Sequence, residues 1–261
     1  MKFDEMIADD LRAVNRQQTV VMLPIAACEQ HGPHLPTSTD VIICEAVARG
    51  VERRLADRLL LLPTLWLGAS QHHLPWGATL TARLETYITL LCEIIEPLLD
   101  DRYRRIMLLN GHGGNIDPMR VALRRLQSRY PDVLLAAGSY WIIAEQEIAS
   151  IMEGENKTIG HAGEAETSLV MHLRPELVRT EAIEPTPGTL DDCVQGMFIC
   201  RDMAQRTAKG ATGLPNLASD EKGAALLEAI VPRVEEAAAT VLNEPLPERV
   251  DHRIRCSIKG S

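Results

Sequence analysis

The chain of 261 residues has few aromatic side chains and no excess of positive charge. Aromatic residues make up 3% of it, and 27 Lys and Arg stand against 36 Asp and Glu, which gives a formal net charge of −9. A nucleic-acid-binding protein needs a basic face and often aromatic rings on which bases stack. An anionic surface also disfavours acidic membranes. We therefore expect neither nucleic acid nor a membrane as a partner.

Long apolar runs and paired cysteines are also missing. No run reaches the roughly 18 apolar residues of a membrane span, and residues 1–18 are polar and acidic where a secretory signal needs a basic start and an apolar stretch. The six cysteines contain no C-x-x-C pair, so we expect them to be reduced; they are Cys28, Cys44, Cys92, Cys193, Cys200 and Cys256. These features together predict a cytoplasmic protein.

What remains is the composition of an ordinary globular protein, with 46% hydrophobic and 24% charged residues. Short, uniformly apolar segments alternate with segments whose apolar residues recur at helical spacing. They predict strands at 20–25, 59–62, 105–109 and 133–138, and helices at about 40–57, 81–99, 116–128, 141–152, 163–174 and 220–242. This alternation is typical of an α/β fold with a parallel sheet covered on both faces. We expect one domain over residues 1–261, with ligands beyond the carboxyl ends of the strands.

Two segments fall outside this alternation. Residues 184–216 are rich in Gly and Pro, so we expect an irregular excursion, either a cover over the site or a surface loop. The tail after Pro245 is expected to be extended.

The first polar cluster follows the strand at 20–25 and contains Glu29, His31 and His34, with Asp40 opening the next helix. Glu29 and His31 lie two residues apart, so on an extended segment their side chains point the same way. Mixed imidazole and carboxylate ligands suit zinc, manganese or iron, whereas magnesium and calcium prefer oxygen alone. The alternative is a hydrogen-bonded Glu–His pair with Asp40 as a helix cap. His34 could support the cluster from behind.

The second cluster is Asn110–Asn115, at the end of the strand at 105–109. Its glycines permit close approach of the backbone, and a helix N-terminus favours anions, so a phosphate is one candidate ligand. However, the segment lacks the Lys and Ser/Thr of a P-loop and the G-x-G-x-x-G spacing of a dinucleotide site. His112 is better explained as a metal ligand delivered into a crowded centre.

The third cluster, Gly160–Ser168, opens the helix at 163–174. Glu164 and Glu166 project to different faces of that helix, so at most one of them should face a site. His161 has a reference pKa near neutrality and could act as an acid or base, although a simple capping role for this segment stays open. Because all three clusters are expected at one edge of the sheet, they predict a shared site.

Other candidates are weaker. No G-x-S-x-G elbow is present, and nothing around Cys28 marks it as a nucleophile. His72 and His73 are adjacent, so on a strand only one of them could reach the site, and a role at its rim or none are both open. His172 and His252 are expected to be structural or exposed.

At these clusters the sequence resembles the creatininase (creatinine amidohydrolase) family. The resemblance spans positions 23 to 223, and the segments that carry it are LPIAACEQHGPHLPTSTD, LLNGHGGN, GSYW, HAGEAETS and GATGLPNLASDEKG. It implies a three-layer α/β/α fold with a mostly parallel central sheet and two divalent ions, Zn, Mn or Fe, at its carboxyl edge. It also implies hydrolysis of a non-peptide C–N bond, in a small cyclic amide or formamide, by a metal-activated water, and a homo-oligomer, commonly a hexamer.

The resemblance also assigns metal ligands. Glu29, Asp40 and His112 would hold one ion and His31 and Asp40 the other, with Asp40 bridging.

One family ligand is absent. Creatininase takes a further ligand from a Glu two residues after the motif histidine, and that position is Gly114 here. Glu166 is our candidate for the missing ligand and for a catalytic carboxylate. His161 matches the histidine that transfers protons.

The creatinine pocket is matched only in part. Trp141 corresponds to one of its aromatic residues, but Lys157 and Gly113 stand where two others are expected, and His73 is a further candidate for substrate binding. Creatinine is therefore not the expected substrate, and Lys157 would favour a polar or anionic one. The family also includes peptide-processing members and ring-opening hydrolases of cyclic keto-sugars, and the latter are an alternative activity. A non-catalytic module that binds phosphate or sugar is the alternative from another class.

Overall fold

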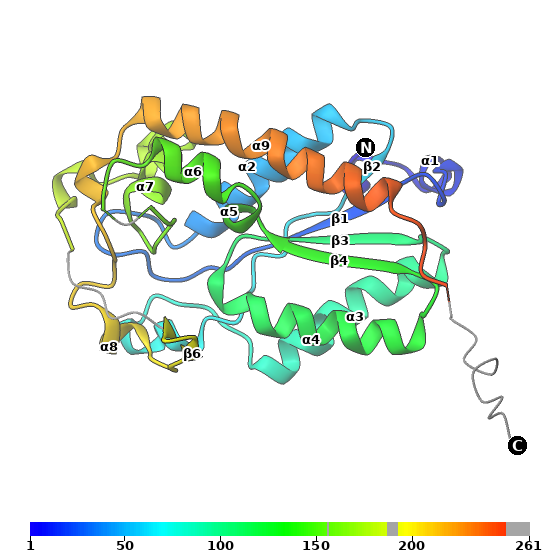
Figure 1. Ribbon diagram of the computed structural model, residues 1–261, viewed down its shortest axis with the longest axis horizontal. Helices are drawn as coiled ribbons and strands as arrows, with labels where there is room; N and C mark the ends of the chain where they lie inside the picture. Colours follow the sequence, from blue (N-terminus) through cyan, green and yellow to red (C-terminus); the bar gives the residue numbers. More distant parts are fainter. Residues whose placement is uncertain (156, 187–192, 249–261) are drawn as a thin grey trace, which may run out of the picture.

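The computed structural model describes residues 1–155, 157–186 and 193–248. Its centre is a four-stranded parallel sheet of order β2-β1-β3-β4 (Figure 1). The strands are β1 (Val20–Ile25), β2 (Leu59–Leu61), β3 (Arg105–Asn110) and β4 (Leu134–Ser139). In the register, Ile25 is opposite Asn110, which is opposite Ser139. The strands β1, β3 and β4 therefore end at one edge, and the chain leaves all three there.

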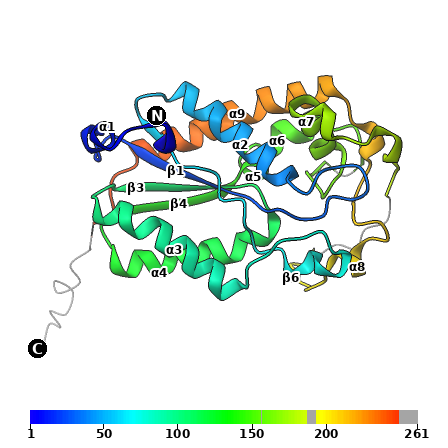
Figure 2. The same ribbon diagram turned by 180° about the vertical axis from the view of Figure 1, so that it is seen from behind.

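Helices cover both faces of the sheet, which confirms the three-layer α/β/α prediction (Figures 1 and 2). One face carries α3 (Leu84–Asp100) and α4 (Ile116–Arg129). The other carries α2 (Thr39–Arg54), α5 (Tyr140–Ile143), α6 (Glu145–Ile151), α7 (Glu164–Leu173) and α9 (Asp220–Asn243). Val20 and Met22 of β1 are buried on one side, and Val21 and Leu23 on the other. This two-sided burial explains why the strands are apolar at nearly every position.

The predicted elements agree with the structure, with local differences at their ends. Helix α3 begins at Leu84 rather than Thr81, because Thr81 bridges to Gly68 and the Ala82 N–H donates to the Gly68 carbonyl at 3.0 Å. The helix predicted over 141–152 is divided into α5 and α6 at Ala144.

The region rich in Gly and Pro contains short regular elements among its described residues. A hairpin of β5 (Cys193–Val194) and β6 (Met197–Phe198) turns at Gln195 and Gly196, both of which have positive φ. Two central residues of positive φ are typical of a type I′ turn. The short helix α8 (Met203–Arg206) follows. Residues 187–192 of this region and 249–261 of the tail lie outside the described residues.

The remaining elements are short. They are η1 (Phe3–Glu5), α1 (Ala8–Ala13), η2 (Gln71–Trp76), η3 (Gly113–Asn115), η4 (Pro175–Leu177), η5 (Thr180–Ala182) and η6 (Pro215–Leu217). Within the described ranges, none of the helices has the length and apolar character needed to cross a bilayer.

Candidate metal centre

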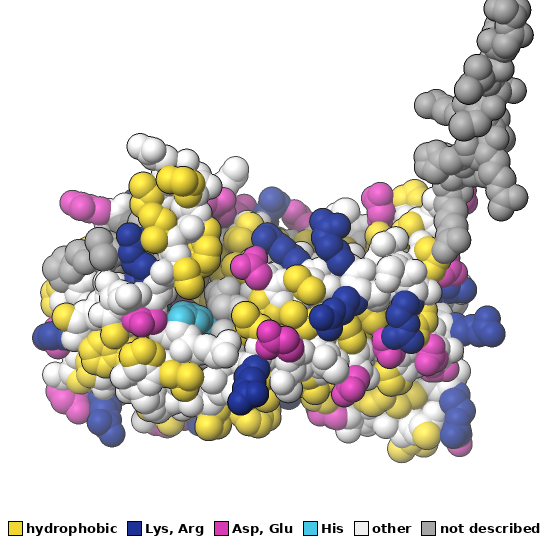
Figure 3. Space-filling model, turned by 90° about the horizontal axis from the view of Figure 1, so that it is seen from below, with side chains coloured by type: hydrophobic (Ala, Val, Ile, Leu, Met, Phe, Trp, Pro, Cys, Tyr) yellow, Lys and Arg dark blue, Asp and Glu magenta, His cyan; other side chains and the backbone are white. Residues whose placement is uncertain are grey.

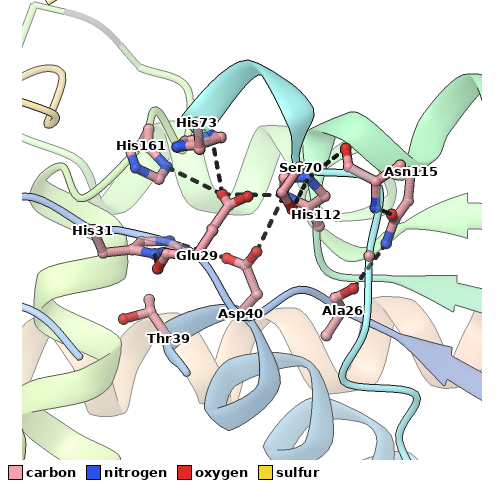
Figure 4. A network of polar contacts seen from close by, with 12 residues as sticks. Ala26, Glu29, His31, Thr39, Asp40, Ser70, His73, His112, Asn115 and His161 are labelled. Carbon is pink, nitrogen blue, oxygen red and sulfur yellow. Dashed lines mark hydrogen bonds and ion pairs between the residues drawn. The ribbon is translucent and has the colours of Figure 1, made fainter. Parts of the chain in front are cut away.

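Four elements deliver acidic and imidazole side chains to the carboxyl edge of the sheet (Figure 4). Glu29 and His31 lie on the segment after β1, and His112 follows β3. Asp40 lies in the first turn of α2, because the Glu29 N–H donates to the Thr37 carbonyl at 2.9 Å and folds the loop back. Glu166 comes from the first turn of α7.

These side chains form two groups that share Asp40. In the first, His112 Nδ1 lies 3.2 Å from Glu29 Oε1 and 3.2 Å from Asp40 Oδ2. In the second, His31 Nε2 lies 3.1 Å from Asp40 Oδ1 and 3.7 Å from Glu166 Oε2. The candidate ligand atoms of each group lie within 4.8 Å of one another. Because one oxygen of Asp40 faces each group, its carboxylate has the arrangement that bridges two cations.

Three ligand atoms at this site make no hydrogen bond of normal geometry within the described part of the chain. They are Glu29 Oε2, His31 Nε2 and Asp40 Oδ2, and all are buried. Buried polar atoms nearly always have a partner, since leaving one without costs about 1–3 kcal/mol. A cation between these atoms would provide that partner.

The charges at the site also indicate a bound cation. Burial by itself would lower the pKa of His31, but the carboxylates of Asp40, Glu166 and Glu29 raise that pKa to about 10. Burial raises the pKa of Glu166 to about 7, with His31 acting in the opposite direction. The buried carboxylates therefore lack positive charge, which divalent ions would supply. Carboxylates with neutral imidazoles are a donor set that fits zinc, manganese or iron.

Both candidate imidazole ligands are oriented by their second ring nitrogen. His31 Nδ1 lies 3.0 Å from the Glu29 carbonyl, to which it can donate, and Nε2 is then left as the ligand atom. His112 Nε2 lies 3.2 Å from Ser70 Oγ and 3.3 Å from the Ala69 carbonyl, so Nδ1 faces the carboxylates. Such outer contacts fix the tautomer and orientation of metal-binding histidines.

The structure explains why position 114 offers no carboxylate. A Cβ atom on Gly114 would lie 2.2 Å from the Ala69 carbonyl oxygen and 2.6 Å from His112 Nε2, too close for any side chain. Glu166 reaches the second group of ligands from α7 instead, and its Oε2 accepts the Ala162 N–H at 2.6 Å.

Only one of the two glutamates at the start of α7 faces this site, as the helical spacing predicts. Glu164 turns away and accepts the N–H groups of Glu153 and Gly154 at 2.9 Å each. Its carboxylate also pairs with Lys222 of α9, and both side chains are buried. Glu164 therefore holds α7 in place while Glu166 lines the site.

His161 lies beside the ligand groups with one ring nitrogen already engaged. Its Nε2 lies 2.9 Å from the Gln30 carbonyl, to which it can donate, and its Nδ1 lies 3.8 Å from Glu29 Oε1. Burial, together with the nearby His31 and His73, lowers the pKa of His161 well below its usual value. A neutral ring with Nδ1 toward the carboxylates can exchange a proton at that atom. Glu29, His31 and His161 also form a third group with metal-ligand spacing.

The expectation that only one of His72 and His73 could reach the site is wrong. They lie on the 3-10 helix η2 instead of a strand, and both line the cavity. His73 Nε2 lies 3.2 Å from Glu29 Oε1, and Gln30 Nε2 contacts His73 Nδ1 at 2.9 Å. The ring of His72 stacks on His112 with centroids 5.6 Å apart.

The groups described above open into a cavity of about 550 Å³. Figure 3 shows a histidine side chain in a hollow of the surface with hydrophobic side chains on both sides. The lining comprises Glu29, Asp40, His72, His73, Gly111, His112, Gly113, Ile116, Trp141, Thr158, Ile159, Gly160, His161, Glu166, Met203, Arg206 and Thr212.

Two residues considered from the sequence lie outside that lining. Lys157 is exposed, and its ammonium group donates to the Met152 carbonyl at 2.6 Å. His34 is buried behind the site, where its Nε2 lies 2.9 Å from Thr167 Oγ1. Away from the site, His172 pairs with Asp220 at the surface, at 2.9 Å. His252 lies outside the described residues.

Several residues of the cavity were not predicted from the sequence. Thr212 belongs to the matched segment GATGLPN, which was a usable signal. Gln30 also belongs to a matched segment, and it joins His73, His161 and the Gly210 carbonyl. No motif marks Arg206, which lines the cavity from the end of α8.

Comparison with known proteins agrees with this geometry. The family model for creatininase, described as creatinine amidohydrolase, matches residues 4–238. The chain belongs to the creatininase family. A solved structure of creatininase superposes with a TM-score of 0.79 at 29% identity, covering 93% of this chain and 98% of that one. The structural neighbours of this chain also include a manganese form of creatininase (TM-score 0.80, 27% identity) and a zinc–zinc form of a creatininase variant (TM-score 0.78, 27% identity).

The relatives found by sequence carry three different activities. The mycofactocin precursor peptide peptidase of Mycobacterium tuberculosis is 31% identical over 81% of each chain, and its Mycobacterium ulcerans counterpart is 34% identical over 62% of each. The creatinine amidohydrolase of Pseudomonas putida is 30% identical over 84% of this chain and 88% of its own. The 3-dehydro-scyllo-inosose hydrolase of Thermotoga maritima is 24% identical over 92% of this chain and 83% of its own. These relatives indicate that this family member is a hydrolase.

Proposed function

We propose that this protein is a metal-dependent amidohydrolase that cleaves a non-peptide C–N bond in a small cyclic amide or formamide. One observation carries the proposal. Carboxylates and imidazoles from the segments after β1 and β3 and from α2 and α7 form two adjoining groups around Asp40. Among the described residues, buried oxygen and nitrogen atoms in these groups make no normal hydrogen bond. This donor set supports two divalent ions per chain, Zn, Mn or Fe.

The ligands would be Glu29, Asp40 and His112 for one ion and His31, Asp40 and Glu166 for the other. Bound divalent ions supply Lewis-acid chemistry, which polarises a carbonyl group and lowers the pKa of water. Glu166 replaces the family ligand for which position 114 has no room.

His161 would move the proton. Because its Nε2 can donate to the Gln30 carbonyl, Nδ1 is the atom that accepts a proton and returns it to the leaving nitrogen. A well-placed acid–base group contributes roughly 10²–10⁴ in rate. The Gln30 carbonyl accepts from His161 Nε2 and the side-chain amide of Gln30 donates to His73 Nδ1, which keeps both rings oriented.

The cavity supports a small substrate other than creatinine. Among the described lining residues, Trp141 is the one Phe, Tyr or Trp. The cavity therefore lacks a pair of aromatic faces to hold a flat ring. We propose that Trp141, His73 and Gly113 contact the substrate. Lys157 remains our candidate for a more distant contact, because it lines a small pocket of about 40 Å³ that also includes Trp141. Because some relatives are peptidases, any assay should compare a peptide amide with the non-peptide amides.

Ring opening of a cyclic keto-sugar is the second candidate, favoured by the inosose hydrolase relative, which aligns over 92% of this chain. Release of ammonia or an amine separates amide hydrolysis from that reaction. A phosphate-binding module is disfavoured, because the loop from Gly111 faces the carboxylates of Glu29, Asp40 and Glu166, which would repel a phosphate.

We also propose a cytoplasmic homo-oligomer, a hexamer. Large apolar side chains are exposed on η2, around it and on the β5–β6 hairpin, and patches of this kind mark contact surfaces. They include Trp66, Leu74, Trp76, Leu80, Val194, Met197 and Phe198. Light scattering after size exclusion measures the state, and a monomer at micromolar concentration would contradict the proposal.

The function is tested by elemental analysis of the purified protein, followed by a screen on the metal-loaded enzyme. The screen compares cyclic amides, formamides, peptides, creatinine and cyclic keto-polyols. The proposal expects about two transition-metal equivalents per chain and release of ammonia or an amine from a non-peptide amide. Turnover of peptides alone would overturn the substrate class, and protein that takes up no metal would overturn the mechanism.

A further inference from the structure

Arg206 brings a permanent positive charge into the cavity of the metal centre. It ends α8, its side chain is partly buried, and among the described lining residues no other is Lys or Arg. The remaining ionisable groups of the lining are three carboxylates and four imidazoles. The ligand carboxylates would be balanced by the divalent ions, so the metal centre itself does not require a guanidinium.

Arg206 and His72 line the same cavity, and helix α8, which Arg206 ends, packs against η2, which carries His72. The ring of His72 in turn stacks on His112, with centroids 5.6 Å apart. Arg206 therefore lines the cavity together with His72 and the candidate metal ligand His112. A group bound by Arg206 would lie beside the reacting bond.

The backbone that carries Arg206 is held by the cap of its own helix. Helix α8 begins with a capping box in which the Gln205 N–H donates to Asp202 Oδ1 at 2.9 Å and the Asp202 N–H to Gln205 Oε1 at 3.0 Å.

The chain after α8 is tied to the catalytic side of the cavity. The Gly210 carbonyl accepts from Gln30 Nε2 at 2.9 Å, and the Thr212 N–H donates to the His161 carbonyl at 2.7 Å. The backbone that follows α8 is thus held at the cavity by Gln30 and His161.

We propose that Arg206 binds a carboxylate of the substrate, so that the substrate class is a small amide that carries a carboxylate near its scissile bond. This inference rests on the proposed hydrolase function. A guanidinium pairs with a carboxylate through two parallel N–H···O bonds, and one guanidinium balances one negative charge. A carboxylate therefore matches this single cation better than a phosphate dianion does. Under the proposed non-peptide class the carboxylate belongs to an N-acyl amino acid, and the C-terminus of a short peptide is the alternative source that the test distinguishes.

The test compares matched acid and amide probes by calorimetry on the metal-loaded protein. The probes are N-formylglycine with N-formylglycinamide, and N-acetyl-dialanine with its C-terminal amide. We expect the wild-type protein to prefer the acid of at least one pair by about tenfold or more, since a charge-assisted hydrogen bond is stronger than a neutral one. The pair that shows the preference identifies the source of the carboxylate.

Arg206→Gln should reduce that preference by about tenfold or more, and Arg206→Lys should retain part of it. The matched control is Lys209→Gln, which removes a cation that pairs with Glu184 outside the cavity, and it should leave the preference unchanged. Carboxylate binding to the metals themselves contributes equally in all variants and cancels when the ratios are compared.

Absence of a preference for the acid in the wild-type protein would overturn the inference. So would an unchanged preference in Arg206→Gln with normal metal content and unfolding midpoint. A preference that depends on Arg206 in a protein that hydrolyses no amide would support the carboxylate site while contradicting the hydrolase proposal. Failure of the carboxylate inference and failure of the hydrolase proposal therefore give different results.

Discussion

His112 and His161 lie in one cavity, and their surroundings give them different roles. The Nδ1 atom of His112 faces two carboxylates at 3.2 Å each, whereas His161 has its nearest carboxylate oxygen at 3.8 Å and can donate its other proton to a backbone carbonyl. The first arrangement is that of a ligand, and the second is that of an acid–base group.

We predict that His112→Ala loses bound metal and nearly all turnover. His161→Ala should keep its metal and lose turnover by roughly 10²–10⁴. Metal content by elemental analysis and kcat on an amide substrate measure the two effects. If His161→Ala lost its metal, the third group, Glu29 with His31 and His161, would be the true ligand set.

A substitution at Glu166 tests whether this residue replaces the family ligand that is absent at position 114. Glu166→Gln should reduce the metal content from two equivalents to about one, because it removes the second carboxylate from the His31 and Asp40 group. The control is Glu176→Gln, which removes an exposed carboxylate paired with Arg174 and should keep both metal equivalents. Two tightly bound equivalents in Glu166→Gln would show that another residue completes the site.

The two glycines that follow His112 should respond differently to one added methyl group. A Cβ on Gly114 would overlap the Ala69 carbonyl at 2.2 Å, whereas a Cβ on Gly113 would meet no atom within 4 Å. Gly114→Ala should therefore lower the free energy of unfolding by about 1–3 kcal/mol, the usual cost of overpacking, and Gly113→Ala by much less. Urea denaturation measures both, and equal values would contradict the steric argument.

At the scale of elements, the sequence predicted the parts that depend on hydrophobic pattern. Strand β1 and helix α4 begin where predicted, because apolar periodicity reports burial and both elements pack in the core. The clusters around Glu29, His112 and Glu166 also meet as expected, since parallel strands end at one edge of the sheet.

What the sequence did not predict depends on contacts between distant segments. The two adjacent imidazoles His72 and His73 reach the cavity because η2 turns as a 3-10 helix, a local conformation that no periodicity indicated. Arg206 lies in an irregular region whose path is set by contacts with Gln30 and His161. The sequence pattern carries little information about such contacts. The positions of His72, His73 and Arg206 at the cavity could therefore be found only from the structure.

The contact between α7 and α9 positions Glu166, and its main polar link is the buried pair of Glu164 and Lys222. Lys222→Met should lower the free energy of unfolding by about 3 kcal/mol, because it leaves a buried carboxylate without its cation. Lys209→Met, which removes an exposed ion pair with Glu184, should cost less than about 1 kcal/mol. Similar values for the two variants would show that the buried pair does not stabilise α7.

The same pair predicts a dependence on pH. Burial would raise the pKa of Glu164, but Lys222 and the N–H groups of Glu153 and Gly154 lower it below the ordinary value of 4.5. Its stabilising contribution is therefore present above that value and is lost as the pH falls below it. The difference in stability between the wild type and Lys222→Met should accordingly narrow in acid.

At the scale of the whole molecule, the two faces of the sheet serve different purposes. Helices α3 and α4 on one face contribute mainly apolar packing, whereas α2 and α7 on the other add Asp40 and Glu166 to the ligands carried by the strand ends. We propose that these two helices complete a pair of metal sites around Asp40.

Crystals of the metal-loaded protein, with diffraction recorded at the absorption edge of the bound metal, would locate both ions. We expect two anomalous peaks per chain, one among Glu29, Asp40 and His112 and the other among His31, Asp40 and Glu166, with Asp40 contacting both. A single peak, or two peaks of which either lies outside these groups, would contradict the proposal.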